Sequence, residues 1–339
     1  MSEICLVKSL KLHRDRCWSL DVSNGLLATG SASRDIKLVS LHNYELVEEL
    51  DRTAHKKAVR SVAWRPHSKI LAAGSFDSTI SIWGMGDNDA INPETDLLAI
   101  IEGHENEVKA VAWSSDGYYL ATCSRDKSIW IWETDEIGED YECISVLQEH
   151  SQDVKNIVWH PTRHLIASSS YDDTVRIWKE VDEDWECAAV LTGHQGTVWS
   201  SSFESVETDL RLCSGSDDGT VRIWRCINDD PSSYEQEWEQ EAVLPAAHTK
   251  PVYSVCWSST GLIASSGCDG NLVIYKEVSR GEWIILAQRQ LCHTVFEVNV
   301  VKWATVGTEL LLITGGDDGC VKIWKLDEKN NEVSLNATD

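Results

Sequence analysis

Several kinds of site are missing from this sequence of 339 residues. It holds 11 cysteines but no C-x-x-C pair, and no apolar run approaches the ~20 residues that span a bilayer. Zinc and iron–sulfur clusters usually bind closely spaced pairs of ligands, and disulfide frameworks are typical of short secreted chains. We therefore expect the cysteines to be small apolar strand residues, with no metal and no cofactor bound.

Sequence signatures of catalysis and of secretion are missing as well. There is no Gly-rich phosphate loop, no zincin motif and no isolated nucleophile. The first eight residues lack the pattern of a signal peptide. These absences predict an intracellular protein that is not an enzyme and has no membrane span.

Proline and basic residues are both scarce. The six prolines fall in expected turns or strand starts, where no ladder N–H is lost. Against 55 Asp and Glu stand only 30 Lys and Arg, and the net charge of −25 would repel phosphate backbones and anionic lipid. Because the basic residues are few and not contiguous, we expect protein partners and no direct nucleic-acid or membrane binding.

What the sequence does contain is one unit repeated seven times. Histidines recur 42 to 54 residues apart, and most are followed nine residues later by Trp or Phe. The histidines are His13, His55, His104, His150, His194, His248 and His293. Further along each unit a turn Asp precedes an aromatic residue by six positions. The pairs are Asp77/Trp83, Asp126/Trp132, Asp172/Trp178, Asp218/Trp224, Asp269/Tyr275 and Asp318/Trp324.

Within each unit the apolar residues alternate with period two between turn signals, which predicts four short antiparallel strands. Units of this length with a Gly-His and a terminal Trp resemble WD repeats, so we predict an all-β, seven-bladed β-propeller over residues 3–326. Glu3–Leu12 should complete the last blade beside three strands from Val295–Leu326, with a polar tail over 327–339. Blade 1 is degenerate, because Ser33 and Val39 stand where Asp and Trp are expected.

The recurring His, Asp and Ser could be mistaken for a hydrolase triad. A triad is a single constellation beside an oxyanion hole, whereas this set recurs in blade after blade together with a Trp. We therefore interpret it as a hydrogen-bonded network that satisfies buried polar groups. Trp130, which stands where other blades have Ser, Arg, Val or Lys, is interpreted as an inter-blade packing residue.

Candidate binding residues are found by setting aside the positions that have the same structural role in every blade. Three positions per blade should approach one rim: those three and five residues after the His, and the residue before the turn Asp. They bring together cationic and aromatic side chains, which are frequent at interface hot spots. The candidates are Arg125 first, then Arg60, Lys109, Lys155, Trp18, Trp199, Tyr171, Tyr253 and Phe76. Alternatively, the aromatic residues pack against neighbouring blades and the cations pair with Glu107 and Asp153.

The acidic excess is confined to one kind of connection. Gly84–Asp96, Asp135–Glu142, Glu180–Glu186 and Ile227–Glu241 hold 20 acidic residues and no Lys or Arg. These segments join the third and fourth strands and should lie on the rim opposite the candidates. Solvated surface is the simplest interpretation of such charge runs. On the candidate rim, a protein surface or peptide with acidic and aromatic groups would be complementary.

Specific segments go beyond generic repeat residues. Glu-Gly-His-Glu-Asn-Glu-Val-Lys (102–109), Ala-Thr-Cys-Ser-Arg-Asp-Lys-Ser (121–128) and Gly-His-Gln-Gly-Thr-Val-Trp-Ser (193–200) resemble the WD-repeat component of the cytosolic iron–sulfur protein assembly machinery. So do Ser-Gln-Asp-Val-Lys (151–155) and Ser-Tyr-Asp-Asp-Thr-Val (170–175). The resemblance covers nearly the full length and is weakest in blade 1 and across Ile227–Glu241.

The resemblance implies a non-enzymatic adaptor of the cytosol and nucleus. Its partners would be a small cysteine-containing assembly factor, a large helical-repeat scaffold, a hydrogenase-like iron–sulfur carrier and apo iron–sulfur client proteins. Arg125 falls inside the family-like Ser-Arg-Asp-Lys-Ser motif. The alternative is a generic WD-repeat adaptor, such as a ubiquitin-ligase substrate receptor or a chromatin-complex subunit.

Overall fold

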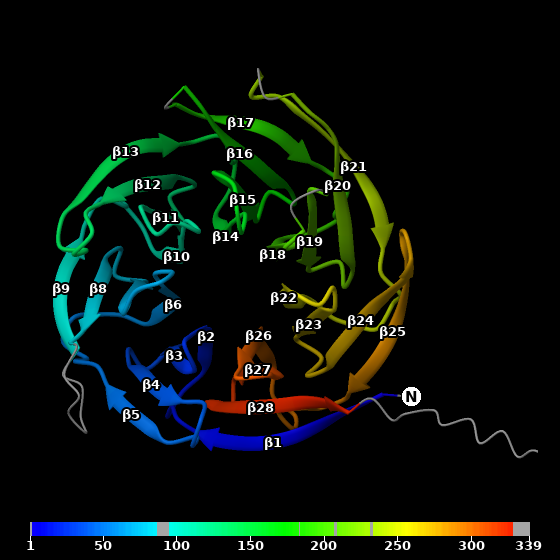
Figure 1. Ribbon diagram of the computed structural model, residues 1–339, viewed down its shortest axis with the longest axis horizontal. Coiled ribbons are helices and arrows are strands. Elements are labelled where there is room, and N and C mark those ends of the chain that lie inside the picture. Colours follow the sequence, from blue (N-terminus) through cyan, green and yellow to red (C-terminus); the bar gives the residue numbers. More distant parts are fainter. Residues whose placement is uncertain (1, 87–94, 183, 207–208, 231–232, 328–339) are drawn as a thin grey trace, which may run out of the picture.

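The computed structural model is a closed ring of seven four-stranded antiparallel sheets (Figure 1). It describes residues 2–86, 95–182, 184–206, 209–230 and 233–327. Within these residues all regular structure is β, and no helix is long and apolar enough to cross a membrane. The prediction of an all-β seven-bladed propeller is therefore confirmed. The expected tail over 327–339 lies, apart from its first residue, outside the described residues.

Each sheet is one blade, and its first strand lines the centre of the ring. Blade 1 comprises β2 (Cys17–Ser23), β3 (Leu26–Ser31), β4 (Ile36–Ser40) and β5 (Leu46–Glu49). Blade 2 comprises β6 (Val59–Trp64), β7 (Ile70–Ser75), β8 (Ile80–Met85) and β9 (Thr95–Ile101). Blade 3 comprises β10 (Val108–Trp113), β11 (Tyr119–Ser124), β12 (Ile129–Thr134) and β13 (Tyr141–Leu147). Blade 4 comprises β14 (Val154–Trp159), β15 (Leu165–Ser170), β16 (Val175–Val181) and β17 (Asp184–Leu191).

The remaining blades follow the same order. Blade 5 comprises β18 (Val198–Phe203), β19 (Arg211–Ser216), β20 (Val221–Asp229) and β21 (Gln236–Val243). Blade 6 comprises β22 (Val252–Trp257), β23 (Ile263–Gly267), β24 (Leu272–Ser279) and β25 (Glu282–Arg289). Blade 7 comprises β26 (Val298–Val306), β27 (Glu309–Gly316), β28 (Cys320–Asp327) and β1 (Glu3–Lys11).

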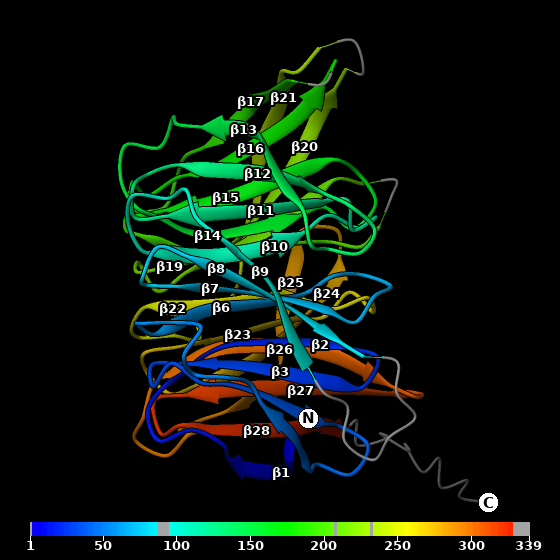
Figure 2. The ribbon, with the colours of Figure 1, turned by 90° about the vertical axis from the view of Figure 1, so that its left-hand side faces the viewer.

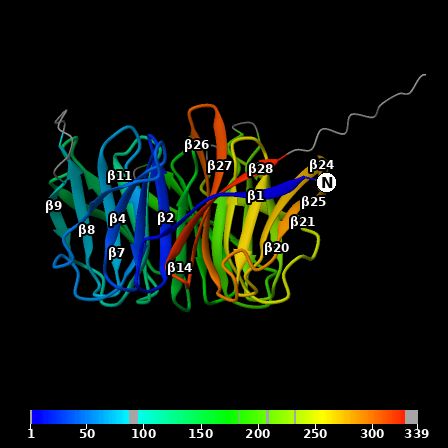
Figure 3. The same ribbon diagram turned by 90° about the horizontal axis from the view of Figure 1, so that it is seen from below.

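The ring closes through its N-terminal strand, as predicted. β1 pairs antiparallel with β28, with Ile4 opposite Leu326 and Leu10 opposite Val321 (Figure 3). Ile4 is buried, whereas the adjacent Cys5 is exposed, so at this end of β1 one face packs on the blade and the other meets solvent. Each first strand remains an edge strand of its sheet, and it packs against the first strands of the two neighbouring blades.

The core consists of apolar clusters, most of them between adjacent blades, rather than one central mass. Strands such as β7 and β15 are buried along their whole length, because both of their faces pack against other strands. Cys123 and Cys213 belong to these clusters, and burial raises the pKa of Cys123 to about 12. All 11 cysteines are free thiols, and of these Cys5 is exposed. Burial of this kind keeps the thiol protonated and unreactive.

Seen edge-on, the strands run between two rims (Figure 2). We call the rim that carries the seven histidines, His13 to His293, the histidine rim. Because consecutive strands are antiparallel, the turns between second and third strands lie on this rim, and the connections between third and fourth strands lie on the opposite rim. Parts of the predicted acidic connections, 87–94, 183 and 231–232, fall outside the described residues.

The predicted His–Asp–Ser–Trp network is present. In blade 4, His150 Nδ1 lies 2.8 Å from Asp172 Oδ2, His150 Nε2 lies 2.7 Å from Ser168 Oγ, and the Trp178 indole donates to the same Ser168 oxygen at 2.8 Å. The same arrangement occurs around His104, His194 and His293, with Thr replacing Ser in blades 3 and 7. In each set, the His, Asp, hydroxyl and Trp side chains contact one another within one blade and stabilise that blade.

In blades 1 and 2 the same network is completed by a residue at a different sequence position. In blade 2 the second strand has Ala73 at the hydroxyl position, and Ser81 of β8 contacts both His55 and the Trp83 indole at 2.8 Å. In blade 1, Ser33 occupies the usual Asp position, but Asp35 reaches His13 from two residues further on. The expectation of a degenerate blade 1 therefore holds for the motif positions, while the His–Asp pair itself is retained.

Candidate partner-binding rim

A backbone hydrogen bond places the predicted positions together on the histidine rim. In every blade, the residue before the turn Asp donates its N–H to the carbonyl of the residue three positions after the His or its equivalent. Arg125 donates to Glu107 at 3.0 Å, Tyr171 to Asp153 at 2.9 Å and Phe76 to Ala58 at 3.0 Å. The sequence-based expectation that these positions share one rim is thus met by the local geometry.

The position five residues after the His is the second residue of each innermost strand. These residues form a ring around the mouth of a central channel of 370 Å³. In chain order they are Trp18, Arg60, Lys109, Lys155, Trp199 and Tyr253, with Asn299 in blade 7. Asn299 was not among the predicted residues, because an inserted residue shifts its spacing from His293. Its amide bridges blades 7 and 1 by donating to the Cys17 carbonyl at 3.1 Å.

Three cations of this ring lie over aromatic faces. Lys109 Nζ is 4.2 Å from the centre of the Phe76 ring, and Lys155 Nζ is 4.9 Å from Tyr171 and 5.3 Å from Trp199. Arg60 is 5.9 Å from Trp18. A cation over an aromatic ring is attracted to the negative face of the ring, so these contacts fix the orientation of both side chains.

Acidic residues of the same rim neutralise part of this charge. Lys109 forms an ion pair with Glu107, and Lys155 Nζ lies 3.2 Å from Asp153. Burial lowers the pKa of Lys109, and the Glu107 contact only partly offsets it. On this rim, cations therefore alternate with acids and aromatic rings. The predicted cationic and aromatic residues do share the rim, and the alternative of local pairing with Glu107 and Asp153 is also met.

Arg125 differs from the other cations because it projects outward. About half of its side chain (54%) is exposed, Nη1 lies 3.5 Å from Glu107 Oε1, and Nε lies 4.0 Å from Asp153 Oδ2. The two carboxylates hold the guanidinium between blades 3 and 4 with long, weak contacts. Tyr171, on the neighbouring turn, is 53% exposed. These two side chains can therefore reach a partner without moving other residues.

On the far side of the channel mouth the aromatic residues form a hollow of 210 Å³. Trp199 and Tyr253 meet edge-to-face, with ring centres 5.4 Å apart, and the Trp199 indole donates to Asp217 at 2.5 Å. Burial, with Cys268 and Glu297 nearby, raises the pKa of Tyr253 above its usual range. The lining of this hollow consists of Arg16, Trp18, Arg60, Trp199, Tyr253, Glu297, Asn299 and Asp317.

Trp130 is a packing residue, as predicted. It stacks on Trp132 of the same blade with ring centres 5.3 Å apart, and it packs against the apolar cluster between blades 2 and 3. Across the described part of the chain, no three His, Cys, Asp or Glu side chains converge in a way that could hold a metal ion.

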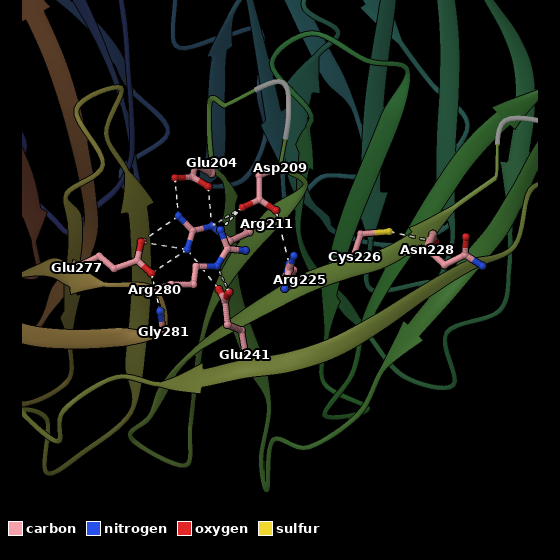
Figure 4. Close-up of polar contacts among 10 residues, drawn as sticks. All are labelled: Glu204, Asp209, Arg211, Arg225, Cys226, Asn228, Glu241, Glu277, Arg280 and Gly281. Carbon is pink, nitrogen blue, oxygen red and sulfur yellow. Dashed lines mark hydrogen bonds and ion pairs between the residues drawn. The ribbon is translucent and has the colours of Figure 1, made fainter.

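Sequence reasoning missed a charged cluster on the opposite rim (Figure 4). Arg211 is buried and forms a two-pronged contact with Glu204, at 2.7 and 2.8 Å, and a further contact with Glu277 at 3.0 Å. Arg280 extends the cluster by pairing with Asp209 and Glu241. The partners in these pairs are 7 to 71 positions apart, so no local motif marks the cluster.

The repeats match a known family. The WD domain, G-beta repeat family matches six segments, residues 46–84, 95–133, 141–179, 185–225, 238–276 and 287–325. Each match begins at the start of the outer strand of one blade or within that strand, and it continues through three strands of the next blade. Residues before 46 are unmatched, in keeping with Ser33 and Val39 at the motif positions of blade 1. The chain is thus a WD-repeat β-propeller protein.

Relatives that match over nearly the whole chain identify one family within the WD-repeat proteins. The chain is 68% identical over 329 residues to probable cytosolic iron-sulfur protein assembly protein 1 of Eremothecium gossypii, covering 97% of this chain and 100% of the relative. It is 63% identical over 330 residues to cytosolic iron-sulfur protein assembly protein 1 of Saccharomyces cerevisiae, covering 97% and 99%. The chain belongs to the cytosolic iron-sulfur protein assembly protein 1 family.

Proposed function

We propose that this protein is a non-enzymatic scaffold of cytosolic iron–sulfur protein assembly that helps deliver clusters to apo-proteins. The observation that carries this proposal is the identity of 68% over nearly the whole chain to a relative with that name. The recurring His, Asp and Ser support a non-catalytic role, because they are engaged in the blade networks described above. The protein would act in the cytosol and, for nuclear client proteins, in the nucleus.

The partners we propose are proteins of the same machinery. They are a small cysteine-containing assembly factor, a large helical-repeat scaffold, a hydrogenase-like iron–sulfur carrier and apo iron–sulfur clients. In this arrangement the cluster is held by the partners, and the propeller positions them. A rigid ring with blades locked to one another suits this role, because it can present several surfaces at fixed distances.

The histidine rim is the proposed docking surface, with Arg125 at its centre. Arg125 and Tyr171 are exposed. The ordered residues beside them are Arg60, Lys109, Lys155, Trp18, Trp199, Tyr253 and Phe76. An exposed guanidinium held only by contacts of 3.5 Å or longer can exchange them for a partner carboxylate or aromatic ring.

The test is affinity purification from cells with wild-type protein, Arg125→Glu and the control Lys127→Glu. Lys127 is an exposed cation on the same turn, so both variants change the net charge equally. We expect Arg125→Glu to bind iron–sulfur assembly proteins at least about tenfold more weakly, a loss of ~1.4 kcal/mol. Lys127→Glu should retain binding, and all three proteins should melt at the same temperature.

The outcomes distinguish the alternatives. Recovery of ubiquitin-ligase or chromatin subunits without iron–sulfur assembly proteins would refute the proposed function in favour of a generic adaptor. Undiminished recovery with a correctly folded Arg125→Glu protein would leave the function standing and refute the assignment of the rim.

A further inference from the structure

Basic residues are unevenly distributed along the chain. Ten of the 30 Lys and Arg lie within the first 60 residues, which contain only eight of the 55 Asp and Glu. This stretch has a net charge of +2, and the remaining 279 residues have a net charge of −27. An acidic surface favours solubility throughout, so a local reversal of sign requires a separate explanation.

The fold gathers these cations on the histidine rim of blades 1 and 2. Arg14 lies in the loop before β2, Arg34 in the turn between β3 and β4, and Lys56 and Lys57 in the loop before β6. The first loop and the turn are joined by the hydrogen bond from the Ala32 N–H to the Arg16 carbonyl, at 3.0 Å. We call Arg14, Arg34, Lys56 and Lys57 the blade 1–2 basic face.

All four side chains of this face are exposed, and none of them is ion-paired with a residue that the structure describes. Arg14, Arg34 and Lys56 form no ion pair with any other residue that the structure describes. Glu107 already pairs with Lys109, and Lys57 adds only its charge to the effects that lower the pKa of this carboxyl. The charge of these residues is therefore directed to solvent.

The charged residues around the basic face already have ion-pair or hydrogen-bond partners. Arg16 pairs with Asp317 at 3.1 Å, and Arg52 lies 3.4 Å from Asp35. The acids on the same loops are used locally, because Asp15 accepts the Arg16 backbone N–H and Asp51 accepts that of Thr53, both at 2.8 Å. No internal pairing removes the excess positive charge of the basic face within the described residues.

The backbone of Arg34 has the left-handed conformation that this turn position has in all seven blades. Its φ is +70°, in the left-handed region, where an L-residue costs about 1 kcal/mol relative to glycine. The same turn position is glycine in blades 5, 6 and 7, at Gly219, Gly270 and Gly319, whereas blades 2, 3 and 4 have Ser78, Lys127 and Asp173 there with positive φ. A non-glycine residue at this position is therefore not unusual in the propeller. What bears on binding is that Arg34 is exposed and forms no ion pair with a residue that the structure describes.

We propose that the blade 1–2 basic face docks a short acidic segment of a partner protein. Three or four exposed cations complement a few carboxylates and would accelerate encounter as well as fix orientation. A long nucleic acid fits less well, because charges act over only about 8 Å at physiological ionic strength and its continuation would meet the acidic remainder of the surface. This surface is distinct from the Arg125 site, and the proposal does not rest on the proposed function.

The probe for the test is a fluorescein-labelled peptide of alternating glutamate and serine, compared with the same peptide containing glutamine. Fluorescence anisotropy with the full-length protein should show binding of the glutamate peptide only, weakened by added salt. The double variant Arg14→Glu/Lys56→Glu should weaken binding at least about fivefold. Lys276→Glu/Arg289→Glu, an equal charge change at exposed positions of blade 6, should leave binding within twofold of wild type.

Arg34→Gly keeps the test independent of folding. It removes one cation while relaxing the left-handed backbone, so reduced peptide binding with an unchanged or higher melting temperature supports the proposal. Equal losses in the blade 1–2 and blade 6 double variants would overturn it, since only net charge would then matter. Tighter binding of a single-stranded oligonucleotide, or self-association abolished by Arg14→Glu/Lys56→Glu, would overturn it in favour of those occupants.

Discussion

Asp35 Oδ1 lies 3.2 Å from the imidazole Nδ1 of His13, and both side chains are completely buried. Burial alone would raise the pKa of Asp35, but the contacts with His13, Ser31 and Ser33 outweigh it and hold this pKa below its usual range. Asp35 comes two residues later than the Asp of the other blades. Blade 1 thus retains the buried His–Asp contact without the sequence motif that normally provides it.

The first prediction concerns this contact. Asp35→Ala should lower the free energy of unfolding by about 3 kcal/mol, because it leaves two hydroxyls without their acceptor and removes the carboxylate beside a buried imidazole. Ser33→Ala, at the position where the motif Asp would stand, should cost less than about 1 kcal/mol. Urea denaturation of the two variants provides the measurement. A larger loss for Ser33→Ala would show that Asp35 is not the replacement for the missing Asp.

The second prediction concerns the substitute hydroxyl of blade 2. Ser81→Ala should destabilise the protein by about 2 kcal/mol, because His55 and the Trp83 indole both lose their partner. Ala73→Ser would restore a hydroxyl at the position used by the other blades. The double variant Ala73→Ser/Ser81→Ala should therefore recover most of the loss in thermal unfolding. Additive destabilisation in the double variant would contradict this explanation.

The third prediction is a pH dependence in blade 4. Burial and the charge of Arg163 lower the pKa of His160 to about 4, and its Nδ1 accepts the Thr162 N–H. The folded state therefore binds this proton less tightly than the unfolded state, so the protein loses stability as pH falls below about 6.5. His160→Asn should remove a destabilisation of about 2 kcal/mol at about pH 5 while changing stability little at neutral pH.

His164 should have the opposite effect. Burial would lower its pKa, but its contacts with Asp116 at 2.8 Å and Glu180 at 2.6 Å outweigh burial and raise it. A raised pKa means that its stabilising contribution is complete below about pH 6.5 and is lost as pH rises through the folded-state pKa. The difference in unfolding free energy between wild type and His164→Gln should thus shrink from mildly acidic to alkaline pH. A constant difference would show that the imidazole does not titrate with these contacts.

The fourth prediction concerns the charged cluster that joins blades 5 and 6 on the opposite rim (Figure 4). Arg211→Met should cost about 3 kcal/mol or more, because Glu204 is left buried without its cation. Arg211→Met/Glu204→Gln should be more stable than Arg211→Met, since the unpaired buried charge is gone. Equilibrium unfolding in urea distinguishes the two. Equal stabilities would mean that Glu204 is solvated once Arg211 is removed.

Much of the fold could be read from the sequence because its contacts repeat at nearly constant spacing. His150, Asp172 and Trp178 meet within one unit, and so do their counterparts in the other units. The N-terminal strand was predictable by elimination, because β1 had no unit of its own. The candidate rim was also predictable in outline, since strand direction alone decides which turns lie on the same side.

Which cations of that rim are paired with acidic residues could not be predicted in the same way. The sequence places Lys109 and Lys155 among cations and aromatic residues, and the pairing with Glu107 and Asp153 remained one of two interpretations. Side-chain torsions, which have no period, decide whether a lysine folds over a ring, reaches an acid or does both.

The sequence by itself determined the seven blades, the hydrogen-bonded networks and the rim that carries Arg125, because each depends on residues close in the chain. Only the tertiary structure decided the replacement of Asp by Asp35, the cluster around Arg211 and the gathering of Arg14, Arg34 and Lys56 on one face. The Asp35 contact depends on the conformation of the turn between β3 and β4. The other two arrangements depend on the angle and distance between neighbouring blades, which bring together side chains up to 71 residues apart. Closure of the ring sets that angle, and no local pattern encodes it.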